Sequence, residues 1–236
     1  MLSLLDGIQD FCSFSKYLIR NGYEMCMNSM WPPMCLICKE ITDTQGVCVS
    51  CWSSITWLQN DASSVIVQGH GDPLKVYAAM EYDALSKHLF LALKMQDKTH
   101  IAPYLAQLMI QKFAHVFLEY DYIVPVPMHR WSLIKRTYNQ SAIIAMHIWR
   151  KLRPCPIYAP SMLRKTKMTA RQMRLSQSAR LRNVRNAFSV SRDITGAKIL
   201  LIDDVMTTGA TMYECTKALL KSGASDVGCM VVARVL

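Results

Sequence analysis

The chain has no uninterrupted apolar segment of the roughly 20 residues that a membrane-spanning helix needs. Its first residues also lack a basic stretch and instead carry Asp6 and Asp10, which argues against a cleaved signal peptide. Because both features are missing, we expect a cytoplasmic protein without a membrane span. At 236 residues, the chain is long enough for one main domain with a sizeable core and a smaller appendage.

Acidic residues are missing from the whole segment from Tyr122 to Arg192, although the chain contains 17 of them. That segment holds fifteen of the 27 lysines and arginines, so the rest of the chain is mildly acidic. The excess indicates a polyanionic partner such as nucleic acid or pyrophosphate, with a solvated basic face as the alternative. Residues 161–186 are the most basic part and offer few core residues, so we expect a mobile loop or a partly ordered arm there.

Disulfides are not expected, because structural disulfides are rare in cytoplasmic proteins and the nine cysteines are unevenly placed. Four of them form two C-x-x-C pairs separated by nine residues: Cys35, Cys38, Cys48 and Cys51. Pairs at this distance place four thiolates around one tetrahedral Zn²⁺, with a metal-free thiol cluster or a redox pair as the alternative. The module is too small for a conventional core, so we expect structural zinc to supply its folding energy.

We expect three parts along the chain. Residues 1–30 have apolar positions at helical spacing, which predicts an amphipathic helix packed on the domain or on a second copy in a homo-oligomer. A small zinc-ribbon-like module is expected at residues 31–58. After a polar linker, residues 73–236 are expected to form the main domain.

Strand and helix patterns alternate through the main domain. Apolar runs predict strands at 76–80, 123–127, 154–160, 198–203 and 227–234, and helical spacing predicts helices at 84–95, 102–119, 140–152 and 211–222. This alternation is typical of an α/β fold, with a parallel sheet flanked by helices. Ligands of such folds bind at the carboxyl ends of strands, so we expect the loops after Val126 and Ile202 at one edge.

The stretch from Ile199 to Thr211 carries the most informative pattern. An apolar strand is expected to end at two adjacent acids, Asp203 and Asp204, and a hydroxyl-rich loop around Gly209 follows. Thr211 and Glu214 have the spacing of a capping box, which predicts that a helix begins there. A helix N-terminus facing such a loop binds anions, and neighbouring carboxylates suit a ligand that also brings hydroxyls or Mg²⁺.

These residues also resemble known families. The run Leu200-Leu201-Ile202-Asp203-Asp204-Val205-Met206-Thr207-Thr208-Gly209-Ala210-Thr211 is similar to the phosphoribosyl pyrophosphate signature of type I phosphoribosyltransferases. Together, Arg136-Thr137-Tyr138-Asn139-Gln140, the series Thr169, Gln172, Arg180, Asn183 and Phe188, and the paired C-x-x-C resemble the ComF family. That family joins an N-terminal zinc module to a phosphoribosyltransferase-like domain and is associated with competence.

The resemblance implies a role for each matching residue. Asp203 and Asp204 would hold the ribose hydroxyls, directly or through Mg²⁺. The loop residues Thr207, Thr208, Gly209, Ala210 and Thr211 would hold the 5′-phosphate. The segment 125–130 takes the place of the pyrophosphate-binding loop. Further ligand contacts are expected from basic residues: His129, Arg130, Arg136, Lys165 and Arg180.

Two residues depart from the pattern of these families. Thr207 stands where purine-specific members often carry an acid, so a purine-salvage activity would lack its general base. Thr137 stands where glycine is usual, and a β-branched residue resists positive φ, so we expect the local turn to differ.

Three functions are therefore expected from the resemblance. The first is Mg²⁺-dependent phosphoribosyl transfer, a glycosyltransferase reaction, to an unidentified acceptor. The second is a non-catalytic role in DNA uptake, with single-stranded DNA or a competence helicase as partner. The third is a sensor of phosphoribosyl pyrophosphate.

Overall fold

The computed structural model describes residues 32–43, 46–59, 62–67, 72–95, 101–152, 154, 156–167 and 184–236. The chain divides into two compact units, Met1–Trp52 and Ser53–Leu236, and each is described by itself. The helix predicted at residues 1–30 lies outside the described residues, as does Arg180. Within the described ranges, no helix is long and apolar enough to cross a membrane.

The described part of the first unit is built around its cysteines. Isolated β-bridges join Met34 to Ile41 and Cys35 to Gly46, and the short helix α2 (Val49–Ser53) follows. Apart from Cys35 and Cys51, only Leu36 and Ile37 are buried hydrophobic residues of this stretch. Such a core is too small to stabilise a fold without a crosslink or a metal.

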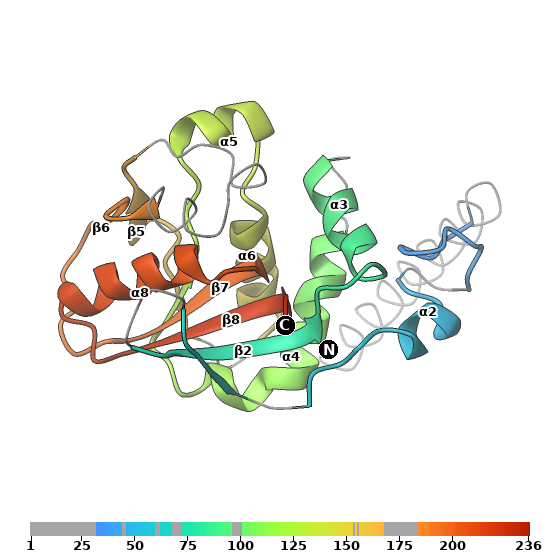
Figure 1. Ribbon diagram of the computed structural model, residues 1–236, viewed down its shortest axis with the longest axis horizontal. Helices are drawn as coiled ribbons and strands as arrows, with labels where there is room; N and C mark the ends of the chain where they lie inside the picture. Colours follow the sequence, from blue (N-terminus) through green and yellow to red (C-terminus); the bar gives the residue numbers. More distant parts are fainter. Residues whose placement is uncertain are drawn as a thin grey trace, which may run out of the picture. The chain divides into compact units, whose positions relative to one another are not determined.

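The second unit contains a six-stranded sheet in the order β1-β2-β8-β7-β3-β4 (Figure 1). The antiparallel edge strand β1 joins five strands that run parallel to one another. This arrangement confirms the predicted parallel sheet. The strands are β1 (Ser63–Val65), β2 (Leu74–Glu81), β3 (Tyr122–Pro125), β4 (Ile157–Tyr158), β7 (Lys198–Met206) and β8 (Asp226–Arg234).

Helices cover both faces of this sheet, as Figure 1 shows. One face carries α4 (Ile101–Phe117) and α6 (Gln140–Lys151), and α3 (Lys87–Met95) packs against α4. The other face carries α8 (Ala210–Lys221), whose apolar side chains join the buried residues of β7 and β8 in one hydrophobic cluster. Both faces are buried, which explains why the central strands read as continuous apolar runs.

Strand β7 is longer than the sequence pattern predicts. Its pairing with β3 ends where Pro125 meets Ile202, but its pairing with β8 continues to Met206. The expectation that the strand spans residues 198–203 is therefore wrong at its end, because β7 extends to Met206. Asp203 and Asp204 lie inside a strand that has a partner on one side only, at the carboxyl edge of the sheet.

The start of α8 also differs from the prediction. The helix begins at Ala210, its N-cap is Gly209, and no side chain caps this end in the described structure. The capping box is therefore wrong. Glu214 is instead buried and accepts a hydrogen bond of 2.7 Å from the backbone N–H of Asn186. Asn186 lies just before strand β6 (Phe188–Val190). The Glu214 carboxylate therefore binds Asn186, which is distant in the sequence, and not the end of its own helix.

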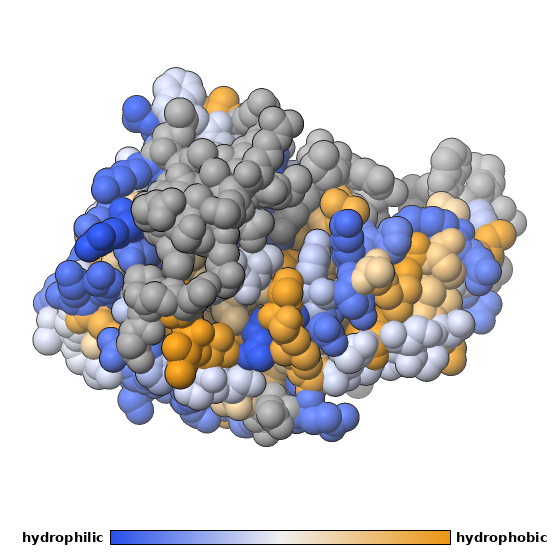
Figure 2. All heavy atoms as spheres, in the orientation of Figure 1, coloured by the Kyte–Doolittle hydropathy of each residue, from blue (hydrophilic) through white to orange (hydrophobic). Residues whose placement is uncertain are grey.

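A short strand lies within residues 161–186, for which a mobile loop or a partly ordered arm is expected. Strand β5 (Leu163–Lys165) pairs antiparallel with β6 (Phe188–Val190), while residues 168–183 lie outside the described ranges. Hydrophilic residues gather on the surface over β5, β6 and the neighbouring end of α8 (Figure 2). The hairpin thus presents a polar side outward and packs Leu163 and Phe188 on the core.

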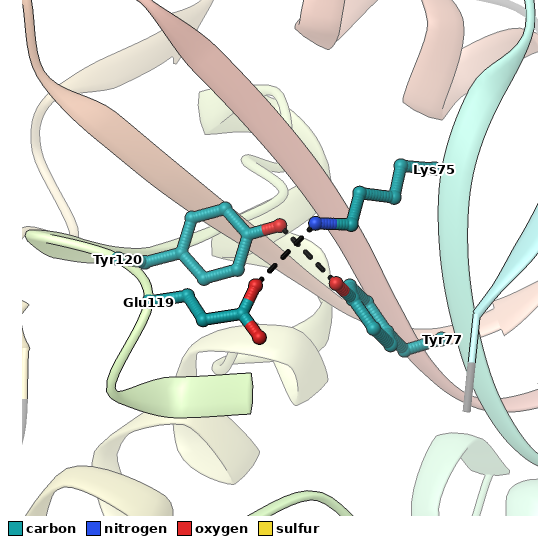
Figure 3. Close-up of polar contacts among 4 residues, drawn as sticks. All are labelled: Lys75, Tyr77, Glu119 and Tyr120. Atoms are coloured by element: carbon teal, nitrogen blue, oxygen red, sulfur yellow. Dashed lines mark hydrogen bonds and ion pairs between the residues drawn. The ribbon is translucent and has the colours of Figure 1, made fainter. Parts of the chain in front are cut away.

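A polar cluster closes the amino edge of the sheet (Figure 3). Lys75 Nζ lies 3.4 Å from Glu119 Oε2 and 5.5 Å and 5.6 Å from the ring centroids of Tyr77 and Tyr120. The two tyrosine hydroxyls are 3.5 Å apart. Burial raises the pKa of Tyr120, and the hydrogen bond with Tyr77 raises it further. The tyrosine therefore stays neutral beside the lysine.

Candidate functional site

A cavity of about 300 Å³ opens at the carboxyl edge of the sheet. One side is formed by the end of β7, the following loop and the first turn of α8, which together span Asp203 to Met212. The other side is apolar and consists of Tyr82, Phe90 and Leu91, from the end of β2 and from α3. The predicted acids and the predicted phosphate loop, Thr207 to Thr211, therefore line one cavity.

Hydrogen bonds fix the orientation of the two acids. Asp203 Oδ1 accepts from the hydroxyl of Ser141 at 2.6 Å and from the backbone N–H of Asp204 at 2.9 Å. Asp204 Oδ1 accepts from the backbone N–H of Val205 at 2.8 Å, and its side chain is buried. Donors of this kind limit the rotation of a carboxylate.

The loop after β7 depends on glycine at residue 209. Gly209 has φ of 74°, and a Cβ there would lie 2.9 Å from Val67 Cγ2. A larger residue would meet both backbone strain and a steric clash. The turn brings Thr207 and Thr208 to the cavity beside the N-terminus of α8, where the helix dipole favours anions.

Lys165, on β5, is not among the residues that line the cavity. Burial lowers the pKa of Lys165, and electrostatic interactions with Cys215 and Asp203 act in the opposite direction. Cys215 is fully buried, and burial raises its thiol pKa well above the usual value, so Asp203 is the acid that faces the lysine. The structure thus brings a cation from the basic segment within electrostatic reach of the first acid.

The loop after β3 lies beside β7 at the same edge. The N–H of Val126 donates to Ile202 O at 2.9 Å, and His129 caps α5 (Arg130–Arg136) by accepting from the N–H of Trp131. His129 is buried, whereas Arg130 is exposed and places its guanidinium 5.6 Å from the indole centroid. None of His129, Arg130 and Arg136 lines the 300 Å³ cavity.

Thr137 ends α5 in the left-handed conformation, with φ of 67°. Its N–H donates to Leu133 O at 2.7 Å, which supplies the hydrogen bond that holds it there. A β-branched residue therefore adopts the positive φ that its side chain disfavours. The expectation that threonine would prevent this conformation is wrong.

Sequence reasoning missed Ser141 and the apolar wall of the cavity. Ser141 follows the motif Arg136 to Gln140 directly, but a lone serine in a helical stretch carries no signal of its contact. Tyr82, Phe90 and Leu91 sit in ordinary apolar patterns. They lie near the acids because β2 and β7 are separated in the sheet by β8 alone. The sequence does not show this strand order.

The four cysteines of the first unit fit a zinc site. Their sulfur atoms all lie within 4.8 Å of one another, and Cys38 Sγ is 3.7 Å from Cys48 Sγ. Tetrahedral Zn²⁺ with Zn–S bonds of about 2.3 Å separates its sulfur ligands by about 3.8 Å. The set therefore already has the size of a Cys₄ site.

Backbone N–H groups prepare this set for a metal. Burial raises the pKa of Cys35, but N–H donors, that of Cys48 first, outweigh it and bring the pKa to about 6. Burial and the neighbouring sulfurs raise the pKa of Cys51 to about 12. Cys35 thus ionises most readily, and zinc must displace the proton of Cys51.

Comparison with known proteins agrees with this geometry. Residues 139–236 match the family described as phosphoribosyl transferase domain. DNA utilization protein YhgH of Escherichia coli is 28% identical over 209 residues, which cover 86% of this chain and 91% of that protein. Competence protein F of Haemophilus influenzae is 26% identical over 235 residues, which cover 96% of this chain and 100% of that protein.

Among solved structures, orotate phosphoribosyltransferase of Mycobacterium tuberculosis aligns with a TM-score of 0.36 and 14% identity, covering 77% of this chain and 78% of that one.

Proposed function

Since the chain belongs to the ComF family of phosphoribosyltransferase-like proteins, we propose that it binds phosphoribosyl pyrophosphate with Mg²⁺ and transfers the phosphoribosyl group to an acceptor. The observation that carries this proposal is the single cavity that contains both acids and the glycine-centred loop. A ligand with a phosphate and neighbouring hydroxyls uses both. We also propose that the protein is cytoplasmic. The acceptor is unidentified.

The phosphate end of the ligand belongs at the loop. In this proposal, backbone N–H groups from Thr207 to Thr211 hold the 5′-phosphate at the N-terminus of α8. No side chain caps that end in the described structure, and a helix N-terminus of this kind suits a phosphate. Asp203 and Asp204 then accept hydrogen bonds from the ribose hydroxyls.

The acids also suit Mg²⁺, which takes oxygen ligands and often binds through one or two carboxylates plus substrate phosphates. In the described part of the chain, the cysteine cluster is the one group of three or more potential metal-ligating side chains. The acids therefore form half of a site, which the oxygens of the ligand would complete. When bound, Mg²⁺ would neutralise part of the pyrophosphate charge.

Transfer in this proposal needs positioning and charge rather than a covalent intermediate. The bond from the anomeric carbon to the pyrophosphate oxygen breaks, the electron pair leaves on that oxygen, and the acceptor forms the new bond. Lys165 and the basic residues after β3 stabilise the departing charge. Thr207 provides no base, so a suitable acceptor loses its proton elsewhere or has none to lose.

Calorimetry with phosphoribosyl pyrophosphate and Mg²⁺ tests binding. We expect the wild type to bind and the Asp203→Asn/Asp204→Asn variant to bind about a hundredfold more weakly, because two charged hydrogen-bond acceptors are lost. Glu119→Gln, which removes an acid at the opposite edge of the sheet, serves as the control. A wild type that fails to bind would refute the proposal, and release of pyrophosphate with a trial acceptor would establish transfer.

A second candidate function, binding of single-stranded DNA, is favoured by the surface of α5. Trp131, Leu133 and Ile134 are exposed there, Trp131 by 57%, and the Arg130 guanidinium lies over the indole at 5.6 Å from its centroid. No acid occurs in the segment that contains this helix. An exposed aromatic ring among cations suits base stacking combined with phosphate contacts.

Anisotropy of a labelled oligothymidylate across several salt concentrations tests this candidate. Trp131→Ala should weaken binding about tenfold at every salt concentration, and Trp131→Phe should restore part of it. Arg130→Gln should instead make the salt dependence shallower, because fewer phosphates are neutralised. Leu118→Ala, at an apolar position that is 62% exposed, is the control. Absence of binding at low salt would eliminate this candidate.

A further inference from the structure

The first turn of α6 reaches from the loop after β3 to the first acid. Asn139 is the N-cap, and its side-chain Oδ1 accepts from the N–H of Ser141 at 3.1 Å. The Nδ2 of Asn139 donates to Val126 O at 2.9 Å. Ser141, which is 4% exposed, donates its hydroxyl to Asp203 Oδ1 at 2.6 Å. Two side chains, those of Asn139 and Ser141, thus connect the loop after β3 with the acid on β7.

The Ser141 hydroxyl is not needed to cap its own helix. Asn139 already performs that task, and asparagine is among the preferred N-cap residues. The hydroxyl is therefore available for a contact outside the helix, and it meets a carboxylate. A hydroxyl-to-carboxylate bond of this length belongs to the strong, charge-assisted class.

The contact restricts how the acid can turn. Asp203 Oδ1 receives the Ser141 hydroxyl from α6 and the N–H of Asp204 from its own strand. The two donors come from different elements, so rotation of the carboxylate would break at least one of these bonds. The carboxylate is therefore held by donors from two elements before any ligand arrives.

We propose that Ser141 is a positioning residue, which holds the Asp203 carboxylate in the orientation that engages the ribose hydroxyls. The inference rests on the proposed binding of phosphoribosyl pyrophosphate and adds a residue that acts through Asp203 without touching the ligand. Loss of the hydroxyl leaves the acid in place but removes one of the donors that limit its rotation, so part of the binding energy is spent on ordering the carboxylate.

Calorimetry of variants with phosphoribosyl pyrophosphate and Mg²⁺ tests the role. Ser141→Ala should bind about tenfold more weakly, the loss that corresponds to one charge-assisted hydrogen bond. Ser141→Thr keeps the hydroxyl and should recover most of the affinity. Ser141→Cys keeps the size but donates poorly, and should resemble Ser141→Ala even if the alanine variant is unstable.

The matched control is Ser225→Ala, which removes a hydroxyl bond of 2.7 Å to Gly196 O at the amino edge of the sheet. A second readout separates positioning from general damage. Inorganic phosphate, followed by ³¹P NMR, occupies only the phosphate loop, so its affinity should be equal in wild type and Ser141→Ala. Damage to the whole site would weaken the binding of both phosphoribosyl pyrophosphate and phosphate.

The outcomes distinguish the two proposals. Tight binding by the wild type with equal affinity in Ser141→Ala would overturn the role of Ser141 and leave the proposed function standing. Equal losses for phosphoribosyl pyrophosphate and phosphate would also overturn it, because they indicate a structural defect. A wild type that binds no phosphoribosyl pyrophosphate would refute the proposed function and this inference with it.

Discussion

Gly228 lies where there is no room for a side chain. A Cβ at this position would lie 2.2 Å from the hydroxyl oxygen of Tyr120 and 2.6 Å from its Cζ. Tyr120 also contacts Lys75 and Tyr77 (Figure 3), which limits how far its ring can move. The amino edge of the sheet therefore depends on a glycine whose backbone conformation is unremarkable.

We expect Gly228→Ala to lower the free energy of unfolding by about 1–3 kcal/mol, the usual cost of overpacking a tight site. Urea denaturation of the variant and the wild type measures this difference. Tyr120→Phe removes the atom nearest to the added Cβ. In that background, Gly228→Ala should therefore lower the free energy of unfolding by less than it does in the wild type. An alanine variant as stable as the wild type would contradict the contact.

The pH dependence of stability has an identifiable source in α6. Burial lowers the pKa of His147 below its ordinary value of 6.5, and Arg150 and Lys151 lower it further. The folded state therefore takes up this proton at lower pH than the unfolded state does. Stability contributed by neutral His147 is present above pH 6.5 and is lost as the pH falls below that value.

We expect His147→Gln to reduce the loss of unfolding free energy between pH 7.5 and pH 5.5, measured by urea denaturation at both values. His88→Gln, at an exposed position on α3, controls for the removal of a histidine. If the unfolding free energy changes equally in wild type and His147→Gln between pH 7.5 and pH 5.5, another group dominates the pH dependence there.

Among the elements, those with a strong apolar period could be predicted from the sequence. The strands at β2, β7 and β8 and the helices at α4, α6 and α8 all appear near the expected positions. Their patterns are strong because both faces of the central sheet are buried, so most strand positions must be apolar. The candidate acids and the phosphate loop followed from the strand that precedes them.

The misplaced boundaries have one physical origin, which is tertiary pairing. Strand β7 continues past Ile202 because β8 continues beside it, and Glu214 bonds Asn186 instead of its own helix end. Ser141 escaped notice for the same reason, since its partner Asp203 is 62 residues away. Local patterns describe a residue's neighbours in sequence, and these contacts join residues that only the fold brings together.

At the scale of the molecule, the two units have different sources of stability. Ser53–Leu236 contains a large hydrophobic cluster, whereas few residues are buried in the described part of Met1–Trp52. We propose that the zinc ribbon expected at residues 31–58 forms within the first unit, which ends at Trp52, and that its folding depends on the metal. Folding of the second unit should be independent of it.

We expect removal of zinc by a strong chelator to expose the cysteines to a thiol reagent and to make the first unit sensitive to limited proteolysis. The far-UV circular dichroism of the second unit should change little. Purified, reduced protein should contain about one zinc per chain, and added Zn²⁺ should reverse the effects. A metal content near zero with protected thiols would contradict the site.

The two acids of β7 bond the amides that follow them: Asp203 holds the N–H of Asp204, and Asp204 holds that of Val205. These amides are thus bonded to the same carboxylates that the proposed ligand would use. Their rates of hydrogen–deuterium exchange should respond whenever a ligand draws on those oxygens. A peptide spanning 203–206, followed by mass spectrometry, would then report occupancy of the site without a label, a coupled assay or a known acceptor.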